Sequence, residues 1–139
     1  MKFLKEDYFR ETKGHFKCER FEIWLDNGIL YSAYAPNTYL DLETAKEVVR
    51  ERLKLSNGIL RPVFSNITNI VKIDKEARTF FSHGDSIKLV SAIAILTTNK
   101  LQEIAGNFYI NFDRPPLPTK LFISEKKALD WLEIFKHVN

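Results

Sequence analysis

The chain has 139 residues, of which 45% are hydrophobic and 28% are charged. This composition is typical of one globular domain that is large enough to form a single hydrophobic core. Its 21 basic and 18 acidic residues give a net charge of +3, and the two signs alternate in segments such as KEVVRERLK and SEKKALDWLE. Because the basic residues form no stripe, the charge pattern argues against a nucleic-acid-binding protein.

The sequence contains no disulfide or metal-binding pattern. Its one cysteine, Cys18, excludes an intramolecular disulfide, and its three histidines are too scattered for a zinc site. We therefore expect no cofactor and no metal. The opening segment MKFLKEDYFRETKG lacks an apolar core, and the longest apolar run, around residues 89–96, is too short to span a bilayer. These features predict a cytoplasmic protein with no membrane span.

The first predicted elements form a β-hairpin. Residues 1–17 have no clear period and are interpreted as an N-terminal arm, whereas residues 18–139 are interpreted as one domain. Alternation from Cys18 onward predicts a strand, with Phe21, Ile23 and Leu25 on one face and Glu22 and Trp24 on the other. Asn27-Gly28 tolerates the positive φ angles of a tight turn, so residues 29–35 are expected to return as the second strand.

A helix and a central strand are expected next. Asp41 is placed to cap a helix whose apolar positions are Ala45, Val48, Val49 and Leu53, and Asn57-Gly58 is expected to end it. A strand at Val63 and Phe64 then leads into a polar turn. Asp74 is expected to cap the second helix by accepting a hydrogen bond from a backbone N–H, an interaction that contributes about 1 kcal/mol. This helix should end near residues 82–84.

The remaining chain predicts two more strands and two more helices. The nearly continuous apolar run at residues 89–96 is typical of a strand covered on both faces. Asn99 and Gln102 have the spacing of a capping box for a third helix. The apolar stripe of this helix, which we interpret as core-facing, comprises Leu101, Ile104, Ala105, Phe108 and Phe112. A last strand at residues 120–123 and a helix capped by Ser124 complete the chain.

The predicted order is therefore β-β-α-β-α-β-α-β-α. Because crossovers between parallel strands are right-handed and short, this order predicts an α/β fold: a single mixed, mostly parallel sheet with an N-terminal β-hairpin and helices packed on it.

This order, together with four short runs, resembles the STAS fold of the anti-sigma-factor antagonists, and more closely a group of uncharacterised bacterial STAS-like domains. The runs are Ile23-Trp24-Leu25, Ile73-Asp74-Lys75-Glu76-Ala77, Gly106-Asn107-Phe108 and Pro115-Pro116-Leu117-Pro118-Thr119. The resemblance covers roughly residues 20–137. The antagonists typically carry an Asp-Ser-Ser-Gly run whose serine is phosphorylated. Here Asp74 is followed by Lys75-Glu76-Ala77, so the resemblance does not imply the same phosphoserine switch.

The strand-to-helix corner at residues 65–78 is the first candidate site, because ligands and partners usually bind at the carboxyl edge of an open α/β sheet. Its candidate partner-binding residues, called the corner residues below, are Ser65, Asn66, Thr68, Asn69, Asp74, Lys75 and Arg78. The alternative is structural: the polar residues can close turns through their own backbone, and the charged residues can form a solvated mixed surface.

The second candidate site is a possible ligand or dimer surface formed by Tyr109, Phe112, Pro116 and Pro118. Aromatic residues are enriched at protein interfaces, so this region becomes a partner surface if the aromatic side chains are exposed.

Two functions follow. The first is a non-catalytic protein-interaction or regulatory module that binds another protein or itself, as a possible homodimer, through the corner. The alternative is a small-molecule or lipid-binding domain with a cleft between the hairpin, the third helix and the Pro-rich turn. A closed apolar cavity of a few hundred cubic ångströms would favour the alternative. An enzyme is not expected, since the sequence has no phosphate loop, paired carboxylates or activated nucleophile.

Overall fold

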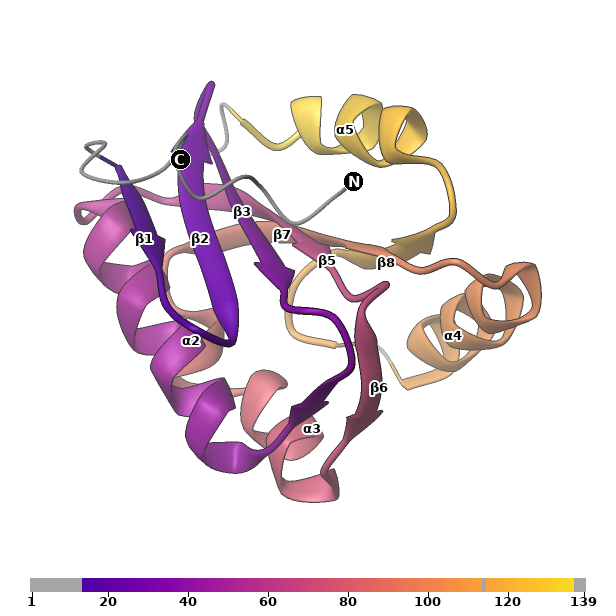
Figure 1. Ribbon diagram of the computed structural model, residues 1–139. Helices are drawn as coiled ribbons and strands as arrows, with labels where there is room; N and C mark the ends of the chain where they lie inside the picture. Colours follow the sequence, from indigo (N-terminus) through magenta and orange to yellow (C-terminus); the bar gives the residue numbers. More distant parts are fainter. Residues whose placement is uncertain (1–13, 114, 137–139) are drawn as a thin grey trace.

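The computed structural model in Figure 1 describes residues 14–113 and 115–136, apart from the side chains of Tyr109, Phe112 and Asp113. Its centre is a six-stranded sheet in the order β1-β2-β3-β5-β7-β8. The strands are β1 (His15–Lys17), β2 (Phe21–Asp26), β3 (Ile29–Tyr34), β5 (Arg61–Asn66), β7 (Val90–Leu96) and β8 (Thr119–Phe122). Strands β1, β2 and β3 are antiparallel, and β3, β5, β7 and β8 are parallel. The predicted mixed, mostly parallel sheet is confirmed.

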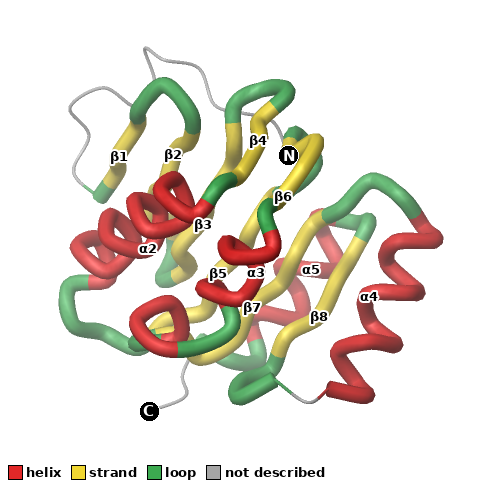
Figure 2. Tube along the Cα trace, turned by 90° about the horizontal axis from the view of Figure 1, so that it is seen from below, coloured by secondary structure: helices red, strands yellow, loops and turns green. Residues whose placement is uncertain are grey.

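The helices cover the two faces of this sheet unequally. Of the helices in the described residues, α5 (Glu125–Glu133) lies on one face, whereas α2 (Leu42–Ser56), α3 (Lys75–Phe81) and α4 (Lys100–Asp113) lie on the other side (Figures 1 and 2). Under α5 the sheet is tightly packed, because the small side chains of Ala92 and Ala94 on β7 allow the helix to approach closely. Ala128 and Leu132 of α5 are fully buried there.

The N-terminal hairpin forms as predicted. Asn27 and Gly28 have φ angles of 50° and 82°, which are the left-handed values that a two-residue hairpin turn requires. The sheet nevertheless begins earlier than expected, since residues 15–17 pair with β2 as the edge strand β1 instead of belonging to an arm. A strand of three residues is too short to show a hydrophobic period. Residues 1–13 of the predicted arm lie outside the described residues.

Helix α2 also begins and ends as predicted. The Asp41 carboxylate accepts a hydrogen bond from the Thr44 backbone N–H at 2.9 Å, and Asn57 ends the helix with a φ of 55°. Ala45, Val48 and Val49 are buried as expected, but Arg52 is buried beside them on the same face. The buried face of α2 therefore includes a cation.

A second, two-stranded parallel sheet was not predicted. It pairs β4 (Thr38–Leu40) with β6 (Ile70–Ile73), two segments in which the sequence predicts no strand. The prediction that Asp74 caps α3 through its side chain is wrong: Asp74 occupies the N-cap position, but its carboxylate accepts a hydrogen bond from the Tyr39 hydroxyl. The small sheet places Tyr39 beside Asp74, which a local capping rule cannot foresee.

The prediction that the apolar stripe of α4 faces the core is wrong as well. Leu101, Ile104 and Phe108 are 74%, 57% and 65% exposed. Helix α4 lies along the outer edge of β8, where the Asn107 amide donates to the Leu121 carbonyl at 2.9 Å and accepts from its N–H at 2.8 Å. Asn107 thus makes the hydrogen bonds to the outer backbone edge of β8 that a neighbouring strand would make. Because this side of α4 is attached to β8, the apolar stripe on its other side faces outward.

Candidate functional site

The most prominent feature of the sheet face opposite α5 is a partly enclosed apolar cavity of about 470 Å³. Its floor is formed by side chains from four adjacent strands of the sheet. Its walls come from α2, α3 and the short 3₁₀ helix η1 (Gly84–Ile87), from β4 and β6, and from Ile110 of α4 together with the Pro-rich turn that follows. Helices that are distant in sequence therefore enclose one space.

The sheet register places the floor residues in two rows. One row runs from Ser32 through Ser65 and Ile95 to Leu121, and the next includes Val63, Ile93 and Thr119. Because side chains alternate between the two faces of a strand, the neighbours Phe64 and Ala94 point to the α5 side. Val63 and Ser65 of β5 and Ile93 and Ile95 of β7 therefore face the cavity.

The cavity exists because none of the helices in the described part of the chain packs directly on this part of the sheet. Ala92 and Ala94 are completely buried under α5, whereas Ile93 and Ile95, which point the other way from the same strand, are only half-buried. Helix α2 packs over β2 and β3, and α4 lies at the β8 edge. Figure 2, which looks from below, shows α2 over the β2–β3 end of the sheet and α4 beside its β8 edge, with the short α3 between them.

Two large side chains with polar ends, Arg52 and Tyr34, are buried in this mostly apolar lining, together with the small Ser32 and Ser86. Arg52 of α2 is 6% exposed, and its Nη2 donates to the Ser86 carbonyl. Burial lowers the pKa of Arg52 to about 10, so the guanidinium is charged at neutral pH. Tyr34 of β3 is also buried, and burial raises the pKa of its hydroxyl to about 12. Within the described part of the chain, Arg52 forms no ion pair with a carboxylate.

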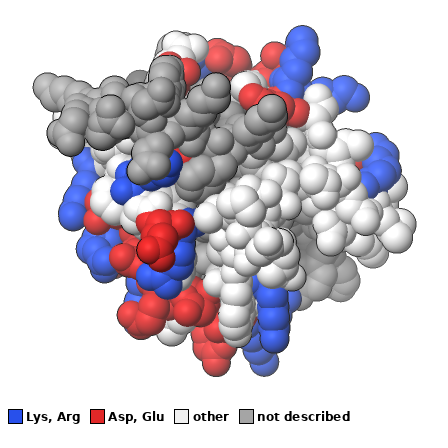
Figure 3. Space-filling view, viewed as in Figure 1, with Lys and Arg blue, Asp and Glu red and all other residues white. Residues whose placement is uncertain are grey.

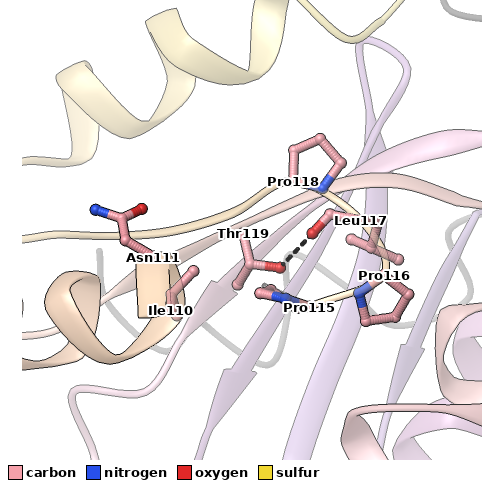
Figure 4. Close-up of a pocket in the computed structure, with 7 residues that line it drawn as sticks. All are labelled: Ile110, Asn111, Pro115, Pro116, Leu117, Pro118 and Thr119. Atoms are coloured by element: carbon pink, nitrogen blue, oxygen red, sulfur yellow. Dashed lines mark hydrogen bonds between the residues drawn. The ribbon is translucent and has the colours of Figure 1, made fainter. Parts of the chain in front are cut away.

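The Pro-rich turn forms the rim of the cavity and a shallow depression of about 430 Å³ beside it (Figure 4). The depression and the cavity share Ile110, Pro115, Pro116, Leu117 and Thr119. The Thr119 hydroxyl donates to the Leu117 carbonyl at 3.0 Å and fixes the turn. Pro116 and Pro118 of the second candidate site therefore lie at this rim, whereas the side chains of Tyr109 and Phe112 lie outside the described residues.

The polar corner residues are used mainly inside the protein. Asn66 is 3% exposed, and its side-chain oxygen accepts hydrogen bonds from the Thr68 N–H at 3.0 Å and the Thr68 hydroxyl at 2.7 Å. The Asn69 amide donates to the Tyr34 carbonyl at 2.9 Å. Ser65 points into the cavity, 3.4 Å from the Ser32 hydroxyl. Asn66 and Thr68 therefore close the turn between β5 and β6, Asn69 links this turn to β3, and Ser65 lines the cavity.

The charged corner residues are more accessible. Lys75 and Arg78 are exposed on α3, and Arg78 also lines the cavity. Asp74 bonds Tyr39, as described above. The structure thus separates the seven corner residues into a turn-closing group and an exposed group on α3, and partner binding by the exposed group stays a prediction.

Arg52 and Tyr34 were missed by the sequence analysis. The available signal was the spacing of Arg52, which lies three and four positions after Val49 and Val48 on the buried face of α2. A charged residue at a core position of an amphipathic helix indicates a buried functional or structural cation. Its role depends on what lies opposite, which only the tertiary structure shows.

Comparison with known families matches residues 23–136 to a domain of unknown function, DUF7793. The chain belongs to this family. No curated protein matches this DUF7793 domain. Among solved structures, it is similar to an uncharacterised protein of the DUF3478 family with a SpoIIAA-like fold from Shewanella loihica PV-4. The two are 23% identical over 86% of this chain and 93% of that one, with a TM-score of 0.55.

A second solved protein of unknown function, from Arthrobacter sp. FB24, is 24% identical over 81% of this chain and 92% of that one. Its TM-score of 0.32 is too low to support a structural argument. The Shewanella protein confirms the STAS-like fold of this DUF7793 domain, because the SpoIIAA-like fold is that of the antagonists. Within residues 14–113 and 115–136, no helix has the length and apolar character needed to cross a bilayer.

Proposed function

We propose that this DUF7793 domain is a non-catalytic binding module for an apolar small molecule or lipid, which occupies the cavity between the sheet, α2, α3 and the Pro-rich turn. The observation that carries the proposal is the cavity itself. The space is concave, partly enclosed and mostly apolar, and its volume is about 470 Å³. It lies within the range of roughly 300–1,000 Å³ that small-molecule sites occupy.

The chemistry of the lining supports binding over catalysis. Most of the lining consists of isoleucine, leucine, valine, proline and aromatic side chains. Among its described residues there is no histidine, aspartate, glutamate or cysteine that could act as a general base or nucleophile. Ser32 and Tyr34 of the hairpin strand β3, Ile110 of α4 and the Pro-rich turn all contribute to the lining, which supports the proposal.

Displacement of an environment-sensitive dye tests this proposal. N-phenyl-1-naphthylamine should become strongly fluorescent with the delipidated protein, and Ile95→Trp should abolish this signal by filling the cavity floor. Ile59→Trp is the matched control, because Ile59 is an exposed isoleucine outside the lining. Native mass spectrometry of the undelipidated protein should show a bound small molecule. Equal dye binding by both variants would contradict the proposal.

A protein-interaction role is the second candidate, favoured by the exposed stripe of α4. Figure 3 shows uncharged side chains continuing from the centre of the view to the α4 side, whereas charged residues gather over α2. Leu101, Ile104 and Phe108 would supply an apolar surface for a second copy of the chain. A homodimer formed through α4 would bury this stripe.

Light scattering coupled to size-exclusion chromatography tests self-association. The wild-type chain should elute as a dimer, and the double variant Ile104→Glu with Phe108→Glu should elute as a monomer. Val71→Glu is the control, because Val71 is equally exposed but lies on β6. A wild-type protein that stays monomeric at high concentration would rule out self-association through α4.

A further inference from the structure

The charged groups of the cavity lining all have one sign. The lining contains two charged residues, Arg52 and Arg78, and no described carboxylate. Arg78 is exposed at the rim on α3, whereas Arg52 is buried deep in the wall on α2. An apolar space with cations and no anions is complementary to a ligand that combines a hydrocarbon body with a negative group.

Arg52 is the more informative of the two cations. The one hydrogen bond of its guanidinium to a described residue goes from Nη2 to the Ser86 carbonyl. An arginine side chain has five N–H donors arranged to bind a planar anion through two parallel hydrogen bonds. Some other basic residues of the chain pair with carboxylates, such as Arg20 with Glu47 at 3.1 Å. Arg52 lacks such a partner among the described residues.

A buried cation without an anion is costly, because desolvation is not offset by a charge partner. The Ser86 carbonyl, which accepts one hydrogen bond, provides only partial compensation. Ser86 itself is fixed in place, since its hydroxyl lies 2.8 Å from the Phe80 carbonyl and 2.7 Å from the His83 carbonyl. The wall therefore holds the guanidinium in one position, beside the apolar space.

We propose that the cavity binds a single-chain amphiphile with a carboxylate head, and that Arg52 recognises the carboxylate while the apolar floor takes the hydrocarbon chain. This proposal rests on the proposed function and specifies its ligand class. The half-buried Ile93, Ile95 and Leu121 provide the surface for the chain. Tyr34 is buried in the same lining and adds a hydroxyl group to this mostly apolar wall.

Decanoate and decanol, which differ at the head group, test the proposal by displacement of N-phenyl-1-naphthylamine from the delipidated full chain. The wild-type protein should bind decanoate about ten- to a hundredfold more tightly than decanol, the range expected for a charge-assisted hydrogen bond. Arg52→Met keeps an apolar side chain of similar length but removes the charge. It should abolish the preference for decanoate and leave decanol affinity within about threefold.

Arg52→Lys is the second variant. It retains the positive charge but not the two-pronged donor geometry, so it should keep only part of the preference. Circular dichroism establishes that each variant is folded. If the wild type binds decanoate and decanol equally, or if Arg52→Met keeps the preference, the carboxylate assignment is wrong and the apolar cavity still stands. If neither ligand displaces the dye, both proposals fail.

Discussion

If the cavity is present, leucine substitutions at two nearby positions of the sheet should have opposite effects on the stability of the protein. Ser65 on β5 points into the cavity, whereas Ala94 on the adjacent strand β7 points to the opposite face, where it is fully buried under α5. Replacing each of them by leucine creates the same side chain on the two faces of one sheet. We expect Ser65→Leu to leave the protein as stable as wild type or more stable, and Ala94→Leu to destabilise it.

The magnitudes follow from the space available. Leucine places three carbons where Ser65 has its hydroxyl, and at about 0.8 kcal/mol for each buried carbon they stabilise the fold by at most about 2.4 kcal/mol. The Ser32–Ser65 contact that is lost is a long one of 3.4 Å and contributes little. At position 94 there is no free volume, so overpacking costs about 1–3 kcal/mol.

Equilibrium unfolding in urea measures this difference. Trp24 and Trp131 both lie on the α5 side, so their fluorescence reports global unfolding without contact with the cavity. The free energies of unfolding of the two variants should differ by about 1–5 kcal/mol, with an unchanged urea dependence. If Ser65→Leu is destabilised as much as Ala94→Leu, this face of the sheet is packed and the cavity is not a feature of the folded protein.

Three further predictions concern the elements around the site. Asn107→Ala should lose about 1–2 kcal/mol, because two hydrogen bonds to Leu121 disappear, and hydrogen exchange at the Leu121 amide should become faster; unchanged exchange would show that α4 does not protect the β8 edge. Asp41→Ala should cost about 1 kcal/mol in thermal unfolding, whereas Asp74→Ala should cost less, because only Asp41 accepts a capping hydrogen bond. Tyr34 should ionise only near its raised pKa of about 12, so the stability that its neutral form provides is fully present below pH 10 and is lost as the pH rises toward 12. The stability of wild type relative to Tyr34→Phe should therefore fall across this range in alkaline unfolding experiments, and a constant difference would contradict the burial of the phenol.

Local signals in the sequence predicted most of the elements correctly. The alternation in residues 21–26, the Asn27-Gly28 turn and the cap and end of α2 depend on interactions within a few residues, which are visible in the sequence. The short strands β1, β4 and β6 were missed, because segments of three or four residues have too few positions to show a period. They form through pairing with distant strands.

The role of α4 shows the limit of hydrophobic patterning. The stripe of Leu101, Ile104 and Phe108 has the spacing of a core-facing helix, and nothing in the sequence indicates that it is exposed. Its orientation depends on Asn107 and Gly106, which attach the opposite side of the helix to Leu121. A pattern shows that a face is apolar, but the partner that covers it is set by the arrangement of the whole chain.

The sequence by itself determined the α/β class, the STAS-like order of elements and the turn-forming chemistry of the corner residues, because these depend on local periodicity and on side chains that bond nearby backbone. Only the tertiary structure decided that Ser65, Ile95 and Leu121 face an apolar cavity with Arg52 in its wall. The physical reason is that a cavity is a space left between elements. It depends on the length and placement of α2, α3 and α4 over the sheet, and no residue in the sequence marks that space.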